Sequence, residues 1–453
     1  MRKKTILRVA LLLTSILGFI VYCSTTGNEE QPDREQAFIT VVSGDLQQGN
    51  DNSLLPVPIV IEVRDASQNS LASQNLNIMV VEGGGSIPSG STVTTDPAGR
   101  ASVQWQIGSG YNGLEVTLVS DSYTAVRAYV CAEGENSSGV HLTRTIASFH
   151  RVEGVLYAIT FYGNYSHETF SRGYSRSGLF ESAREGDNAF NCSLFAVFGD
   201  TNNYLMGRSF DNPAGWVCLT MITKLNPRDG YASIAPVRLR DIGFGPDTDF
   251  DSMNFSAKQR LIDAAYFPPD GVNEAGLIMG LANVIPMPYI RDPAKENIQC
   301  QLWVRKVLDQ CRTVEEAAAL TMRYNITGGG GDLLDVHAIL ADASGRSIIL
   351  DPAEGEMKVI PNAENFQVMT NSPVYGLSVE AQIEQCPRFR TIYERLDSQN
   401  GLMSSDQALD LLQDVGNQWT EWSAVYLLNP RGFRIAIDFN FDPVYQFYLF
   451  PLW

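Results

Sequence analysis

The hydrophobic pattern of this chain changes character part-way along, and that change constrains the fold most strongly. Residues 37–131 contain short β-branched runs such as VPIVIEVRD and LNIMVVEGGG, separated by turn sequences such as DPAGR. Short strands at regular spacing are typical of a β-sandwich. From residue 192 onward, strand-like runs alternate with segments of helical periodicity. The 453 residues therefore predict an all-β domain over 37–133 followed by an α+β domain over 192–453.

Helical periodicity within the second domain predicts helices over four segments, 296–312, 313–324, 378–396 and 404–415. Thr313 and Glu316 are spaced as a capping box at the start of the second of these. Residues 336–351 predict a β-hairpin that turns at Asp342–Gly345, and His337, near its start, is interpreted as a structural residue. Three further strands are expected between residue 422 and the C-terminus.

The first 23 residues are expected to be a targeting segment. Met1–Arg8 carries four positive charges, and Val9–Tyr22 is apolar but short for a bilayer span. Cys23 follows, in a pattern that resembles a bacterial lipoprotein signal, although such signals usually carry a small residue where Tyr22 stands. We therefore expect export to the cell envelope with a lipid on Cys23. The alternative is an uncleaved membrane anchor. Residues 24–36 are polar and predict a flexible tether.

Composition argues against two kinds of partner, nucleic acid and structural zinc. The formal net charge of −18 disfavours a nucleic-acid partner, because like charges repel. The chain has four histidines and no Cys/His pair at zinc spacing, so a structural zinc site is not expected. Export permits disulfides, but no cysteine spacing requires one.

Residues 134–191 read as a linker or pro-segment. The part over 171–190, SRGYSRSGLFESAREGDNAF, is polar and lacks periodicity, whereas GVLYAITFYGNY at 154–165 has the character of a strand.

Residues 189–211, AFNCSLFAVFGDTNNYLMGRSFD, predict a β-hairpin with three candidate catalytic residues at the end opposite its turn. Cys192 begins the first strand, and Arg208 and Asp211 end the second. A lone cysteine is most often a packing residue, but a nearby arginine favours a thiolate. No histidine lies close in sequence to serve as a base. An α-amine could serve instead, which requires Cys192 to be the first residue of the mature chain, with Asp211 orienting that amine.

This hairpin resembles the start of the choloylglycine hydrolase (linear amide C–N hydrolase) family of N-terminal nucleophile enzymes, which includes bile salt hydrolases and penicillin V acylases. The family pattern is an N-terminal Cys with Arg and Asp sixteen and nineteen residues on, as in Cys192, Arg208 and Asp211. Three further segments, DGVNEAGLIMGLAN, MTNSP and PRFRTIYERL, resemble family motifs and assign active-site roles to Asn283, Asn371 and Arg388.

The resemblance implies a four-layer αββα sandwich and hydrolysis of a linear, non-peptide amide without a metal or organic cofactor. Cys192 would be the nucleophile. The Asn283 side chain and the Asn371 backbone N–H would hold the oxyanion. Arg208 would favour the thiolate, and Arg388 would add positive charge or orient the small-molecule substrate.

One departure from the family pattern bears on the substrate. Bile salt hydrolases carry a long insertion between the last two motifs, whereas sixteen residues separate Asn371 from Arg388 here. Bile-salt specificity and tetramer formation are therefore not implied. The shorter form is closer to acyltransferase and ceramidase-like relatives.

Residues 37–131 resemble bacterial Ig-like domains of the invasin/intimin type, which act as spacers or adhesive modules. Trp105 is interpreted as a core residue. Three functions follow as hypotheses: an exported amidohydrolase activated by cleavage of the Asn191–Cys192 bond, an acyltransferase using the same thioester, or a surface adhesin whose hydrolase fold is inactive.

Overall fold

The computed structural model describes residues 34–165, 192–212, 218–328 and 332–450. The predicted signal with Cys23, the polar segment over 171–190 and residue 191 lie outside these ranges, as does nearly all of the tether. Within the described ranges, no helix is both long and apolar enough to cross a membrane. All six described cysteines are buried and unpaired.

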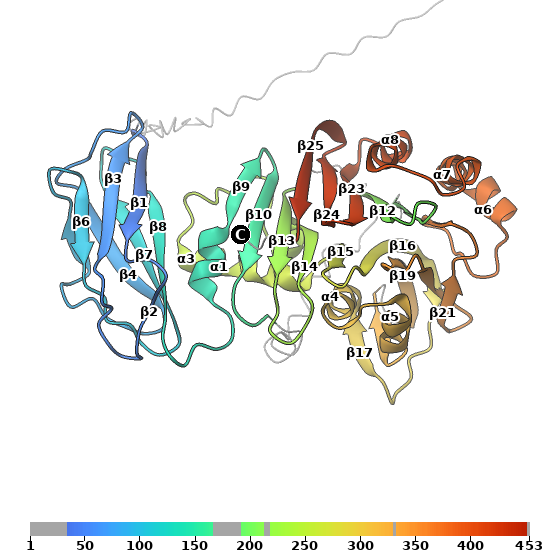
Figure 1. Ribbon diagram of the computed structural model, residues 1–453, viewed down its shortest axis with the longest axis horizontal. Coiled ribbons are helices and arrows are strands. Elements are labelled where there is room, and N and C mark those ends of the chain that lie inside the picture. Colours follow the sequence, from blue (N-terminus) through green and yellow to red (C-terminus); the bar gives the residue numbers. More distant parts are fainter. Residues whose placement is uncertain (1–33, 166–191, 213–217, 329–331, 451–453) are drawn as a thin grey trace, which may run out of the picture.

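Residues 37–133 form a β-sandwich of two sheets, at the blue end of Figure 1. The strand orders are β1-β3-β6 and β2-β8-β7-β4-β5. The strands are β1 (Ala37–Ser43), β2 (Gln47–Gln48), β3 (Ile59–Asp65), β4 (Asn75–Glu82), β5 (Thr92–Thr94), β6 (Arg100–Val103), β7 (Tyr111–Val119) and β8 (Arg127–Glu133). In β3, alternate residues Ile59, Ile61 and Val63 point into a shared core that also contains Trp105, as predicted.

The remainder of the chain is built on two larger sheets. A nine-stranded sheet has the order β21-β20-β19-β16-β15-β14-β13-β10-β9, and a six-stranded sheet has the order β22-β11-β12-β23-β24-β25. The strands of the first are β9 (His150–Glu153), β10 (Leu156–Phe161), β13 (Thr220–Leu225), β14 (Ser233–Arg238), β15 (Asp270–Asn273), β16 (Ile278–Pro288), β19 (Leu333–Ala341), β20 (Ser347–Ala353) and β21 (Glu356–Pro361). Those of the second are β11 (Ser193–Val197), β12 (Leu205–Asp211), β22 (Phe366–Met369), β23 (Thr420–Leu428), β24 (Arg431–Ile437) and β25 (Asn440–Tyr448).

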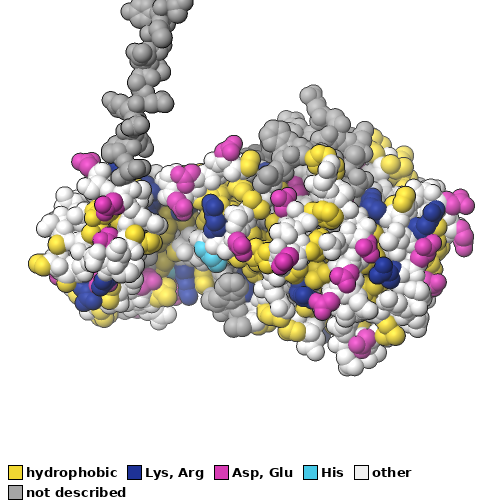
Figure 2. Space-filling view, turned by 90° about the horizontal axis from the view of Figure 1, so that it is seen from above, with side chains coloured by type: hydrophobic (Ala, Val, Ile, Leu, Met, Phe, Trp, Pro, Cys, Tyr) yellow, Lys and Arg dark blue, Asp and Glu magenta, His cyan; other side chains and the backbone are white. Residues whose placement is uncertain are grey.

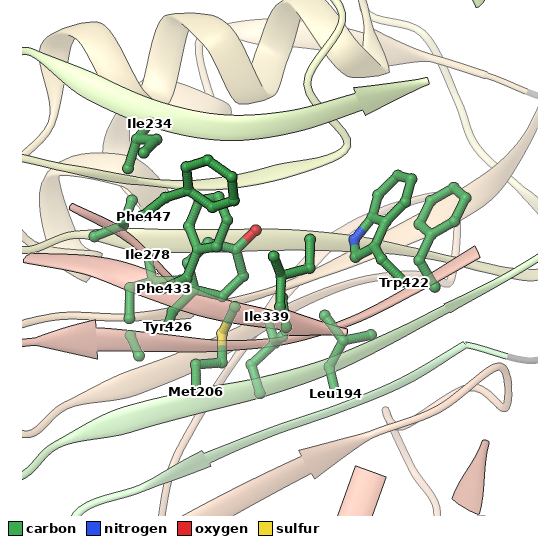
Figure 3. Close-up of a cluster of buried hydrophobic side chains, with 14 of the residues drawn as sticks. Leu194, Met206, Ile234, Ile278, Ile339, Trp422, Tyr426, Phe433 and Phe447 are labelled. Atoms are coloured by element: carbon green, nitrogen blue, oxygen red, sulfur yellow. The ribbon is translucent and has the colours of Figure 1, made fainter. Parts of the chain in front are cut away.

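The two sheets face each other across one apolar core. Figure 3 shows side chains from both sheets meeting there, among them Leu194 and Tyr426 from the six-stranded sheet and Ile278 and Ile339 from the nine-stranded one. Strand alternation produces this layer, because every second residue of each strand faces the partner sheet.

Helices cover the outer faces, so the layers run helix, sheet, sheet, helix, as the sequence resemblance implied (Figure 1). The nine-stranded sheet is covered by α1 (Leu142–Ser148), η2 (Leu239–Ile242), α3 (Phe255–Lys258), η3 (Gln259–Tyr266), α4 (Cys300–Gln310) and α5 (Val314–Thr321). A small parallel pair, β17 (Glu296–Gln299) and β18 (Tyr324–Thr327), lies beside α4. The six-stranded sheet is covered by α6 (Val379–Gln385), α7 (Pro387–Ser398) and α8 (Ser405–Val415).

Local sequence signals explain where these helices begin. The Thr313 hydroxyl accepts the Glu316 N–H (3.2 Å) and so caps α5, although the Glu316 carboxylate accepts from Arg312 rather than from the cap residue. The segment expected to be helical over 378–396 forms two helices. The break falls at Cys386 because Pro387 disfavours a helical conformation in the residue before it.

Part of the segment interpreted as a linker belongs to the nine-stranded sheet. β10 pairs in parallel with β13 over six residues, and Leu156 and Ala158 lie in the core between the two sheets. The strand character of residues 154–165 was visible in the sequence, but its partner was not. The reason is that β13 lies about 60 residues further along the chain, and a parallel pairing leaves no hairpin signal.

The sandwich is joined to the larger part by buried and half-buried polar contacts. The Glu82 carboxylate accepts the backbone N–H groups of Leu142 (2.9 Å) and Thr143 (2.8 Å), which are the first two residues of α1. Glu115 accepts the Phe255 N–H (2.6 Å) at the start of α3. Figure 2 shows the two parts meeting along a continuous surface, with acidic side chains spread over the visible face.

We expect Leu156→Ala to destabilise the two-sheet part by about 2–5 kcal/mol, because it removes a large side chain from the core between the sheets. Chemical denaturation followed by tryptophan fluorescence would measure this loss. Val152→Ala on the neighbouring strand β9 is the control, since Val152 is 37% exposed. Equal effects of the two substitutions would show that β10 does not contribute to this core.

Candidate active site

Cys192 lies directly before β11, the strand between β12 and β22 in the six-stranded sheet. Its side chain is buried and belongs to the core cluster between the two sheets, together with Leu194 and Ala196. Residue 192 thus has the same parity as the inward-facing residues of β11. The neighbouring Ser193 has the opposite parity and contacts the helical layer through Arg388.

Arg208 connects the two sheets. It extends from β12, and its Nη1 donates to the carbonyl oxygen of Leu281 on β16 (2.5 Å). Its Nε is 2.8 Å from a carboxylate oxygen of Asp270 on β15, and neither side chain is exposed to solvent. Asp270 also contacts the Tyr426 hydroxyl. The ion pair fixes β12 against β15, and the hydrogen bond to Leu281 fixes it against β16, the strand that carries Asn283.

An aromatic pair lies beside this arginine. The Arg208 guanidinium carbon lies 4.6 Å from the ring centre of Phe210, which is stacked on Trp422 at 4.2 Å. An aromatic face attracts a cation, most strongly where water is excluded. The position of Arg208 is therefore determined by both charge and packing.

Asp211 ends β12 and accepts hydrogen bonds from three side chains. One carboxylate oxygen accepts from Ser209 (2.7 Å) and from Thr420 (2.6 Å), and the other accepts from the Asn417 amide (3.2 Å). The carboxylate is fully buried. Its orientation is therefore fixed from both sides, by its own strand and by the segment that leads into β23.

Arg388, near the start of α7, links the remaining residues. Its Nη1 donates to the Cys192 carbonyl oxygen (2.5 Å), and its Nη2 donates to the Asn371 side-chain oxygen (3.1 Å). The Asn371 amide nitrogen in turn donates to the Asn283 carbonyl oxygen (2.7 Å). These hydrogen bonds connect the residue directly before β11 to the middle of β16.

Asn283 contacts Asn371 through its backbone carbonyl oxygen. The direction of its side chain does not follow from strand alternation alone. On β16, Ile278 and Ala282 face the other sheet, whereas Met279 and Leu281 face the helices. Alternation alone would place the Asn283 side chain with the second group. The pairing with β19 shifts register directly after Asn283, so regular alternation ends at this residue.

Two groups of the site have shifted ionisation. Burial raises the pKa of the Cys192 thiol, and Arg208 and Arg388 oppose that rise by favouring the thiolate. Burial also raises the pKa of Asp211, against the hydrogen bonds from Thr420 and Ser209. The thiol is therefore held in its neutral form in the intact chain, close to two guanidinium groups that would stabilise its negative charge.

Comparison with known proteins bears on part of this arrangement. Residues 260–410 match the model of the linear amide C-N hydrolases, choloylglycine hydrolase family. A penicillin V acylase of Pectobacterium atrosepticum is 35% identical over 118 residues, which are 23% of this chain. Those residues are 30% of that protein, so the chain spans less than a third of the length of the curated relative it matches.

Two solved structures are similar to this chain at low identity. One is a penicillin V acylase from Agrobacterium tumefaciens, with 19% identity and a TM-score of 0.42, covering 58% of this chain and 87% of that one. The other is a variant of the conjugated bile acid hydrolase from Clostridium perfringens, with 16% identity and a TM-score of 0.42, covering 57% of this chain and 92% of that one.

The family match covers three of the six candidate site residues. Asn283, Asn371 and Arg388 fall inside residues 260–410, whereas Cys192, Arg208 and Asp211 precede that range. Geometry alone connects the two halves, through the hydrogen bonds of Arg388 and the ion pair of Arg208.

Sequence reasoning missed several residues that hold the site. Asp270 is the first residue of the quoted segment DGVNEAGLIMGLAN, but its pairing with Arg208 had no sequence signal. Asn417 and Thr420 lie more than 200 residues from Asp211. The chain thus supplies the acidic partner of the arginine, and the donors to the aspartate, from segments that only the fold brings together.

Other features of the described residues do not add to this site. No group of three or more potential metal ligands occurs among them. A cavity of about 720 Å³ opens at the turn of the β11–β12 hairpin, between Asp200, Asn203 and Asn400. That turn is at the opposite end of the hairpin from Cys192, so the cavity is separate from the site.

We expect Asp211→Asn to be at least as stable as wild type at pH 7, with a melting temperature equal or higher by about 2–4 °C. The raised pKa means that the folded state favours protonated Asp211, so stability is present at low pH and lost as pH rises through the folded-state pKa. The gain should therefore shrink towards pH 4. Asp410→Asn on the exposed face of α8 is the control for thermal melting. A clear drop in melting temperature would mean that the hydrogen bonds to the carboxylate outweigh its burial.

Proposed function

We propose that this protein is an exported amidohydrolase that cleaves a linear carbon–nitrogen amide bond with Cys192 as nucleophile. The observation that carries the proposal is a run of hydrogen bonds that links residues from four separate segments of the chain. Arg388 contacts both the Cys192 backbone and Asn371, and Asn371 contacts Asn283. The match of residues 260–410 to a family of linear amide hydrolases supports the same reaction class.

The reaction needs a base that takes the thiol proton. Asp211 is held by three donors, and the two arginines cannot accept a proton at neutral pH. A free α-amine on Cys192 supplies a base with a pKa of about 7.7–8.0. We therefore infer that the Asn191–Cys192 peptide bond is cut before the enzyme works, and that Asp211 orients the resulting amine.

The proposed cycle has two steps. In the first, the Cys192 α-amine takes the thiol proton while sulfur bonds to the substrate carbonyl carbon, and Asn283 and the Asn371 N–H hold the oxyanion. The carbon–nitrogen bond then breaks, and the ammonium proton passes to the leaving amine. In the second, water gives a proton to the amine while its oxygen bonds to the thioester carbon. The carbon–sulfur bond then breaks, the carboxylic acid leaves, and the sulfur takes the proton back from the ammonium.

Cleavage before Cys192 would divide the chain without dividing the fold. The upstream chain would keep β9 and β10 in the nine-stranded sheet, with Leu156 and Ala158 in the shared core. The Glu82 and Glu115 contacts would hold the sandwich to the same body. We therefore expect the two products to remain associated through the sheet and these contacts.

The remaining parts of the proposal concern location and accessory function. The basic and apolar N-terminus with Cys23 supports an exported lipoprotein held at the membrane. The sandwich at 37–133 fits an Ig-like spacer between that anchor and the enzyme. The substrate is proposed to be a small amide with a bulky acyl group. Penicillin V and a glycine-conjugated bile acid are suitable first probes because the similar proteins are named for such compounds.

N-terminal sequencing of purified protein is expected to find a chain that begins at Cys192. Cys192→Ala should remain uncut at this bond and should not hydrolyse any amide, because it lacks the sulfur needed for both events. Cys218→Ala, a second buried cysteine, is the matched control and should be processed normally. Active wild-type protein in which every molecule keeps the Asn191–Cys192 bond would overturn the mechanism.

Asn283→Ala is expected to lower kcat by about 10²–10³ with a smaller change in KM, because its donor acts on charge that develops in the transition state. Asn202→Ala, in the exposed turn of the β11–β12 hairpin, should leave both constants unchanged. An effect on KM alone would reassign Asn283 to substrate binding.

Labelling and product analysis separate the rival functions. A thiol-reactive acyl analogue should label Cys192 if the protein is an enzyme, whereas an adhesin with an inactive fold would bind its ligand without labelling. An acyltransferase would give a new amide when a second amine is added, and a hydrolase would give the free acid.

A further inference from the structure

His337 occupies a position that its interpretation as a structural residue does not explain. It lies in the middle of β19, is fully buried, and is paired in register with Ala282, the residue before Asn283. Its parity is that of Ile339 and Ala341, which face the core between the two sheets. The imidazole is thus on the side of β19 that faces the other sheet, and β19 pairs with β16, the strand that carries Asn283.

Both ring nitrogens of His337 contact acceptors. Nε2 is 2.7 Å from the backbone carbonyl oxygen of Thr370, which cannot donate, so Nε2 carries a hydrogen. Nδ1 is 3.0 Å from a carboxylate oxygen of Asp351 on β20. Burial raises the pKa of Asp351, but the hydrogen bond from His337, its charge and two backbone N–H groups lower it more, so its pKa is below the usual value. The ring is therefore held from both sides, by the Thr370 carbonyl oxygen and by the Asp351 carboxylate.

The other carboxylate oxygen of Asp351 holds the next part of the same loop. It accepts the backbone N–H groups of Val374 and Tyr375, each at 2.8 Å. His337 and Asp351 together therefore fix residues 370–375 at both ends, from two neighbouring strands of the nine-stranded sheet. The loop itself begins after β22, which belongs to the six-stranded sheet.

Asn371 lies inside this fixed loop, next to Thr370. Its amide donates to the Asn283 carbonyl oxygen, and its oxygen accepts from Arg388, which also holds the Cys192 carbonyl oxygen. A shift of the loop would therefore displace the Asn371 N–H relative to the thiol and release Arg388. His337 has no described contact with Cys192, so its effect on the reaction would pass through Asn371.

We propose that His337 and Asp351 are positioning residues that fix the position of the Asn371 loop, residues 370–375, relative to Cys192. The proposal deepens the proposed function, because it assigns the pair to the oxyanion site of the same reaction. A misplacement of a catalytic group by about 1 Å costs on the order of 10²-fold in rate. Loss of either partner is thus expected to lower kcat much more than it changes KM.

The test compares His337→Ala, His337→Gln and Asp351→Asn with Ile339→Ala, which removes an inward-facing side chain from the same face of β19. For the first and third variants we expect kcat to fall by about 10–10²-fold with KM changed less than about threefold. His337→Gln keeps a donor that can reach Thr370 and should recover part of the loss. Ile339→Ala should lower the melting temperature but leave kcat within about twofold.

Amide hydrogen exchange supplies a readout that does not depend on turnover. In His337→Ala and Asp351→Asn, a peptide covering residues 370–377 should exchange at least tenfold faster than in wild type, whereas a peptide from β23 should be unchanged. Ile339→Ala should not loosen residues 370–377 selectively. If His337→Ala does not fold, Asp351→Asn and His337→Gln carry the test.

The outcomes separate the positioning role from the proposed function. Unchanged exchange of residues 370–377 in both His337→Ala and Asp351→Asn, or in Asp351→Asn alone if His337→Ala does not fold, would overturn the positioning role even if wild type is active. So would faster exchange in an active enzyme whose kcat stays within twofold of wild type. Selective loosening together with a wild type that neither turns over an amide nor labels at Cys192 would support the loop contacts and overturn the amidohydrolase.

Discussion

The buried ion pair between Arg208 and Asp270 is the contact on which the arrangement of the site depends. It joins β12 of one sheet to β15 of the other, and the same guanidinium holds the Leu281 carbonyl oxygen on β16. Removing one partner of a buried pair leaves an unpaired charge, which costs about 3–5 kcal/mol. Apolar packing between the sheets is not directional, whereas the hydrogen bond from Arg208 to the Leu281 carbonyl oxygen is. The position of the Cys192 thiol relative to Asn283 is therefore set by polar contacts inside an apolar layer.

The sequence indicated candidate residues for the site, but not the contacts between them. Cys192, Arg208 and Asp211 were recognisable because they lie on one hairpin, where register follows from the turn. Asp270, Thr420 and the Asp351–His337 pair were not, because their contacts join strands that are distant along the chain. His337 shows the limit most clearly. A histidine in a strand is usually a packing residue, and only the carbonyl of Thr370 and the carboxylate of Asp351 distinguish this one.

The same limit applies to the fold. Strand and helix segments within 192–453 followed from hydrophobic period, and the sandwich core around Trp105 followed from alternation. The domain boundary before residue 192 did not follow. Residues 156–161 complete a sheet whose other strands lie beyond Cys192, and their burial depends on a parallel neighbour that leaves no local signal. A sequence can indicate that a segment is a strand without indicating which domain that strand belongs to.

The position of the boundary gives the proposed activation a physical rationale. A nucleophile with a free amine must begin a chain, yet strand β11, which follows it, lies inside a sheet between two neighbours. An enzyme that began at Cys192 from synthesis would lack β9 and β10 at the end of the nine-stranded sheet, and part of its core with them. Making the upstream strands first, folding them into the sheet and only then cutting the bond satisfies both demands. The raised pKa of the Cys192 thiol agrees with this order, because a neutral buried thiol remains unreactive until a base is released beside it.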